Sequence, residues 1–71
     1  MNTSQTEDLS IFDILRLRSE WEDLARGFVG VPQDGTLDNL EYFIQNGHRK
    51  NRFRPGFQTA LDIAERILQG V

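Results

Sequence analysis

The chain has 71 residues, a net charge of −3, no cysteine and one histidine. The absence of cysteine excludes a disulfide framework and a thiolate metal centre, and one histidine cannot supply the common zinc spacings. This length allows one small domain at most. No apolar run approaches the roughly 18–20 residues of a membrane span, and the N-terminus lacks the basic start and apolar stretch of a signal peptide. We therefore expect a cytoplasmic protein with no membrane partner and no cofactor.

The first helix is predicted over residues 10–26. Residues 1–9 are polar and are expected to form a disordered tail, with a single helical domain over 10–71. Ser10 stands three residues before Asp13, which is the spacing of a capping box. Apolar residues then recur at alternating spacings of three and four: Ile14, Leu17, Trp21, Leu24 and Phe28. Gly27 is expected to end this helix, and Trp21 is expected in its core-facing stripe.

A second helix is predicted after a turn-rich segment over 29–35. Thr36 is a good N-cap. The apolar face that follows consists of Leu37, Leu40, Phe43 and Ile44. The Asn46-Gly47 pair predicts a left-handed stop at its C-terminal end.

The last helix is predicted to begin at Gly56 or Phe57 and to end before Gly70. Pro55 disfavours helical angles at Arg54, so a continuous helix through 50–57 is not expected. No segment shows the alternation of a strand. The sequence therefore predicts an all-α fold, a small three-helix bundle with a basic loop between helices 2 and 3.

The basic loop is the most informative feature of the chain. Residues 42–61 carry +4 and the remainder −7, which together give −3. The candidate partner-binding residues are His48, Arg49, Lys50, Arg52, Phe53 and Arg54. Arginine forks bind phosphate or carboxylate in pairs of hydrogen bonds and stack on aromatic rings.

The cations and the phenylalanine of this loop also have a structural explanation. The arginines could pair with Glu20, Asp38 or Glu41, and cations after the second helix would offset its dipole. Phe53 could stack on a base, anchor an interface or plug the loop into the core.

No catalytic or metal-binding residues are predicted. His48 has no recognisable nucleophile or orienting carboxylate, and no phosphate-binding glycine motif is present, so we expect no enzymatic activity. Phe12, Tyr42 and Ile63 fall beside the main apolar stripes of their helices. They are candidates for a secondary apolar interface.

Two functions are left open at this point. The preferred hypothesis is a small protein-interaction module, an adaptor or an inhibitor of the kind encoded by phages and mobile elements, that docks on an acidic protein surface. The alternative is nucleic-acid binding through phosphate contacts of the same loop. Formation of a homodimer could accompany either function, because it would bury the flanking apolar residues.

Overall fold

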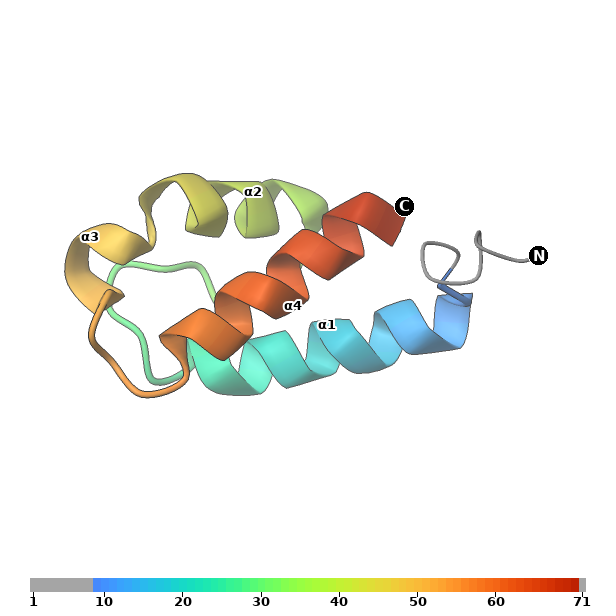
Figure 1. Cartoon of the computed structure of the whole chain (residues 1–71), viewed down its shortest axis with the longest axis horizontal. Coiled ribbons are helices and arrows are strands. Elements are labelled where there is room, and N and C mark those ends of the chain that lie inside the picture. Colours follow the sequence, from blue (N-terminus) through green and yellow to red (C-terminus); the bar gives the residue numbers. More distant parts are fainter. Residues whose placement is uncertain (1–8, 71) are drawn as a thin grey trace.

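The structure is a computed structural model that describes residues 9–70, and these residues form helices and turns without any strand. The helices are α1 (Ile11–Ala25), α2 (Leu37–Asn46), α3 (His48–Asn51) and α4 (Phe57–Gly70). α4 packs against both α1 and α2, and α3 lies at the end of the molecule opposite to the last turn of α4 (Figure 1). Within residues 9–70, no helix is long and apolar enough to cross a membrane. The predicted tail falls, apart from Leu9, outside the described residues.

The start of α1 confirms the predicted capping box. The Asp13 amide donates to the Ser10 hydroxyl at 3.1 Å, and the Ser10 amide donates to the Asp13 carboxylate at 3.4 Å. Such a cap satisfies two backbone amides that the helix itself cannot pair. Leu9, immediately before the cap, packs against the core, and its side chain lies where a Cβ on Gly70 would be. The residue that precedes the cap of α1 therefore lies against the last turn of α4.

The end of α1 differs from the prediction. The helix ends at Ala25, and Gly27 does not adopt a left-handed conformation. Positive φ angles occur at Gly30 (71°) and Gly56 (82°), in the turns that precede Val31 and α4. Glycine therefore supplies left-handed backbone angles inside the connections and not at the end of α1.

The core is centred on four aromatic side chains. Phe43 of α2 contacts three other rings, with centroid distances of 5.5 Å to Trp21, 5.7 Å to Phe28 and 5.5 Å to Phe57. Trp21 is fully buried, which confirms its predicted place in the core. Each such aromatic pair adds about 0.5–1.5 kcal/mol beyond the burial of its surface. These contacts join α1, α2 and the start of α4.

The second helix ends at Asn46 as predicted, but the left-handed conformation expected of the Asn46-Gly47 stop is wrong. Gly47 has right-handed helical angles (φ −62°, ψ −28°), and α3 begins at the next residue. A Cβ on Gly47 would lie 2.5 Å from the Phe43 ring and 2.7 Å from the Phe43 carbonyl oxygen. Glycine is therefore required here by close packing and not by a left-handed turn. As a result, the predicted basic loop starts as a short helix, α3.

The connection between α1 and α2, residues 26–36, is held against α1 by a carboxylate. Glu22 accepts a hydrogen bond from the Gly35 amide at 2.8 Å and pairs with Arg18 at 3.3 Å. The hydrogen bond from the Gly35 amide, with help from Arg18, holds the pKa of the Glu22 carboxyl below its ordinary value, against the opposing effect of burial. The ionised form of Glu22 therefore contributes to the position of this connection.

Candidate interaction surface

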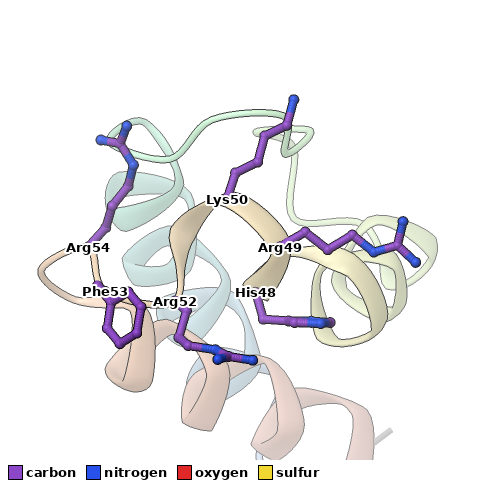
Figure 2. Close-up of a pocket in the computed structure, with 6 residues that line it drawn as sticks. All are labelled: His48, Arg49, Lys50, Arg52, Phe53 and Arg54. Carbon is purple, nitrogen blue, oxygen red and sulfur yellow. The ribbon is translucent and has the colours of Figure 1, made fainter.

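The six candidate partner-binding residues lie together at the α3 end of the molecule. They line an open hollow of about 610 Å³, formed by α3 and the turn that follows it. We call this set the basic surface: His48, Arg49, Lys50, Arg52, Phe53 and Arg54. All six are exposed. Figure 2 shows Lys50 and Arg54 extending to one side of the turn and His48 and Arg52 to the other.

A buried asparagine fixes the base of this surface. Asn51 is 1% exposed, and its side-chain amide makes three hydrogen bonds to backbone groups. It accepts from the Val29 amide at 2.8 Å, donates to the Val29 carbonyl at 3.0 Å and donates to the Gly47 carbonyl at 2.8 Å. Because this side chain satisfies both backbone groups of Val29, it joins α3 to the connection 26–36. Asn51 was not predicted as a site residue, although it is the only uncharged polar residue in the cationic run 49–54.

The turn after α3 is held by backbone hydrogen bonds. The Arg54 amide donates to the Asn51 carbonyl at 2.9 Å, and the Phe57 amide donates to the Arg54 carbonyl at 3.1 Å. The expected break in the helix before Pro55 is confirmed, since α3 ends at Asn51. The positive φ of Gly56 brings the chain back against Leu24, whose side chain would lie 3.1 Å from a Cβ at that position. The turn therefore presents its side chains outward from a fixed backbone.

The cations of the basic surface lack carboxylate partners, in contrast to those of α1. Arg16 and Arg18 of α1 and Arg26 at its C-cap each pair with a carboxylate at 3.3–3.5 Å, and their partners are Asp13, Glu22 and Asp23. Among residues 9–70, none of the four cations of the basic surface has a carboxylate within 4 Å. The expected pairing with Glu20, Asp38 or Glu41 is therefore wrong. Ion pairing within the described fold does not explain these charges.

Phe53 is the most exposed large apolar residue among those described, at 91%. The idea that it plugs the segment into the core is therefore wrong, because the turn over 52–56 directs its side chain away from the aromatic cluster. The Arg52 guanidinium lies 5.9 Å from the centre of its ring, within the range of a cation–π contact. The exposed Phe53 ring lowers the solubility of the folded protein and contributes nothing to the packing of its core.

A second, smaller hollow adjoins the basic surface on the α2 side. It measures about 270 Å³ and shares Arg49 and Lys50 with the basic surface. Its other lining residues come from the connection 26–36 and from α2 and its end: Val29, Gly30, Tyr42, Asn46 and Gly47. We call it the side groove.

The three residues predicted as a secondary apolar interface do not come together. Tyr42 is 46% exposed and lines the side groove, and Phe12 is 78% exposed on the first turn of α1. Ile63 is 8% exposed and belongs to the core, because α4 is covered on two sides by α1 and α2. Phe12 instead shares an exposed apolar patch with Ile11 and Leu15 of its own helix. That patch is at the end of the molecule opposite to α3 (Figure 1).

The described residues offer no grouping for metal binding. No three histidine or acidic side chains of residues 9–70 converge on a point where an ion could be held. His48 is exposed and has no hydrogen bond to a carboxylate within the same range. The chemistry that the site offers is therefore that of its guanidinium and ammonium groups and its exposed ring.

Comparison with known proteins adds no relative. The chain matches no protein-family profile, no curated protein and no solved structure.

Proposed function

We propose that this chain is a non-enzymatic protein-interaction module that docks through its basic surface onto an acidic surface of another protein. The observation that carries the proposal is Phe53, which is 91% exposed on a turn flanked by cations that have no carboxylate partner among residues 9–70. Exposed aromatic and arginine side chains are the residue types that most often dominate binding energy at protein interfaces. A module of this kind acts as an adaptor or an inhibitor by occupying its partner's surface.

The residues of the basic surface divide into two roles. Phe53 is the anchor that enters an apolar pocket of the partner, and Arg52 and Arg54 make paired hydrogen bonds to carboxylates beside that pocket. We assign Arg49 and Lys50 to the rim of the interface, away from Phe53, where a charge raises the rate of association more than it strengthens the final complex. This arrangement is supported by the buried Asn51, which orders the backbone before any partner arrives and so lowers the entropy cost of docking.

The overall charge favours a protein over a nucleic acid as the partner. The chain carries −3, and the exposed part of α4 next to the basic surface carries Asp62 and Glu65 against Arg66. Proteins that bind phosphate backbones without sequence preference usually present a positive net charge or a long basic face. A protein is therefore the proposed partner, and the test below distinguishes it from a nucleic acid.

The test is affinity capture from a lysate of the native host with matched triple variants. Arg49, Arg52 and Arg54 are changed to alanine in one variant, and Arg16, Arg26 and Arg66 in the other, so both carry −6. The proposal predicts a protein that wild type and the second variant recover equally, that the first variant loses, and that nuclease treatment leaves unchanged. Recovery that disappears after nuclease treatment would identify a nucleic acid as the partner and overturn the proposal. Equal recovery by both variants would show that binding does not use the basic surface.

A further inference from the structure

The side groove offers a second contact point that neither the charge pattern nor the exposed phenylalanine reveals. Two of its lining side chains offer apolar surface, with Val29 43% exposed and Tyr42 46% exposed, beside the polar Asn46. The stem of Lys50 borders it, since the Lys50 Cδ lies 3.7 Å from where a Cβ on Gly30 would be. Exposed apolar surface on Val29 and Tyr42 next to the cations Arg49 and Lys50 is complementary to a segment that carries an apolar side chain beside a carboxylate.

The size of the side groove suits a side chain of a partner. Small-molecule sites measure roughly 300–1,000 Å³ and enclose most of their ligand. The side groove is about 270 Å³ and open to solvent along the rim formed by Arg49 and Lys50. It therefore has room for an apolar side chain that enters from a chain lying across the surface.

Two segments that line the side groove, at Val29 and at Gly47, are tied to each other by Asn51, the same residue that orders the basic surface. Val29 on one wall is bonded through both backbone groups to Asn51, whose side chain also bonds the Gly47 carbonyl on the floor. Part-buried hydrogen bonds between segments that are 22 residues apart in the chain thus fix the position of Val29 beside the groove. Since Arg49 and Lys50 line both hollows, a bound segment can pass from one to the other without leaving the protein.

We infer that the side groove and the basic surface form one continuous binding site for an acidic segment of a partner protein that carries an apolar residue next to its carboxylates. The apolar residue enters between Val29 and Tyr42, and the carboxylates meet Arg49 and Lys50. This inference rests on the proposed function and names the chemistry of the partner that the basic surface binds.

The test uses a library of random dodecapeptides displayed on phage and selected on the immobilised full-length chain. The expected result is enrichment of peptides with aspartate or glutamate close to an aromatic or branched aliphatic residue. Synthetic copies of these peptides should bind Tyr42→Ser at least about tenfold more weakly than wild type, and should shift the backbone amide signal of Gly30 in a nuclear magnetic resonance titration. Leu37→Ser is the matched control, because Leu37 is 47% exposed on the same helix but lines neither hollow, and it should bind as wild type does. Thermal unfolding of both serine variants checks that they fold.

The outcomes separate this inference from the proposed function. Acidic peptides that lack an apolar residue, or that bind Tyr42→Ser as tightly as wild type but lose binding to the Arg49/Arg52/Arg54→Ala variant, would overturn the side-groove inference and leave the proposed function standing. A library without enrichment would also overturn the side-groove inference alone, and peptides that bind the triple variant as tightly as wild type would overturn both.

Discussion

Replacement of Asn51 by alanine should destabilise the protein more than any other single change in the basic segment. The side chain is 1% exposed and makes hydrogen bonds of 2.8, 3.0 and 2.8 Å to backbone groups. Each bond contributes about 0.5–1.5 kcal/mol, so their loss costs about 3 kcal/mol. The better helix propensity of alanine returns about 0.5 kcal/mol.

The assay is thermal and urea unfolding followed by circular dichroism. A net loss of about 2.5 kcal/mol corresponds to a fall of roughly 10–20 °C in Tm, at about 4–8 °C per kcal/mol for a domain of this size. Asn46→Ala is the control: the Asn46 side chain makes one hydrogen bond, at 3.4 Å, to the Tyr42 carbonyl of its own helix. Its loss should cost under about 0.5 kcal/mol. A loss below about 1 kcal/mol for Asn51→Ala would refute the argument that this asparagine fixes the basic surface.

Asn51→Asp tests the same geometry through pH. The acceptor that faces the Val29 amide is retained, but a carboxylate oxygen would replace the donor that faces two carbonyl oxygens at 3.0 and 2.8 Å. Burial opposite these oxygens disfavours the charged form, so the pKa of the new carboxyl rises in the folded state. Linkage then makes the variant least stable, relative to wild type, at neutral pH, and the deficit should shrink as pH falls toward 4. A deficit that does not depend on pH would contradict the hydrogen-bond assignment.

Three further predictions concern the fold. Gly47→Ala should destabilise by about 1–3 kcal/mol in urea unfolding despite a better helix propensity, because its Cβ would meet the Phe43 ring at 2.5 Å; a stabilised variant would disprove this packing. Stability should fall as pH drops below 4.5, the ordinary value for Glu22, because its pKa is lowered in the folded state and protonation weakens its bonds. Glu22→Gln should flatten that part of the pH profile, and an unchanged profile would count against this role. Ile63→Ala should cost about 2–4 kcal/mol and Phe12→Ala under about 0.5, since the first residue is buried and the second exposed; equal Tm values would contradict the assigned burial.

Local signals in the sequence were sufficient to predict the starts of α1 and α2. The capping box at Ser10 and the N-cap at Thr36 involve groups three residues apart, so their chemistry can be recognised without the fold. The buried stripe through Leu17 and Trp21 follows equally from spacing along one helix. These features depend on residues that are neighbours on a helix whatever packs against it.

The features that were missed depend on contacts between distant segments. Gly47 resembles a left-handed stop in the sequence, but the Phe43 ring packed against it decides its conformation. The role of Asn51 depends on Val29, which lies 22 residues earlier in the chain. Ile63 falls beside the main stripe of its helix, yet it is buried because α4 is covered by two helices.

The sequence indicated which residues make up the basic surface, but not how the structure arranges them. The basic residues could be named from the charge pattern, because a run of cations without acidic residues can be read from the sequence and does not depend on the fold. Whether Phe53 points inward or outward could not be predicted, since that depends on the turn held by the Arg54 and Phe57 amides. The contribution of Val29 to an adjoining groove likewise requires the connection 26–36 to be in place.

The most direct test of the proposed function is the dissociation constant of the captured partner protein for two phenylalanine variants, measured by calorimetry with purified components. Phe53 and Phe12 are 91% and 78% exposed, so their replacement by alanine removes similar surface from opposite ends of the molecule and should leave stability unchanged. The account predicts that Phe53→Ala weakens binding at least about tenfold, which is 1.4 kcal/mol, and that Phe12→Ala binds as wild type does. Wild-type affinity for Phe53→Ala would contradict the claim that this residue anchors the interface.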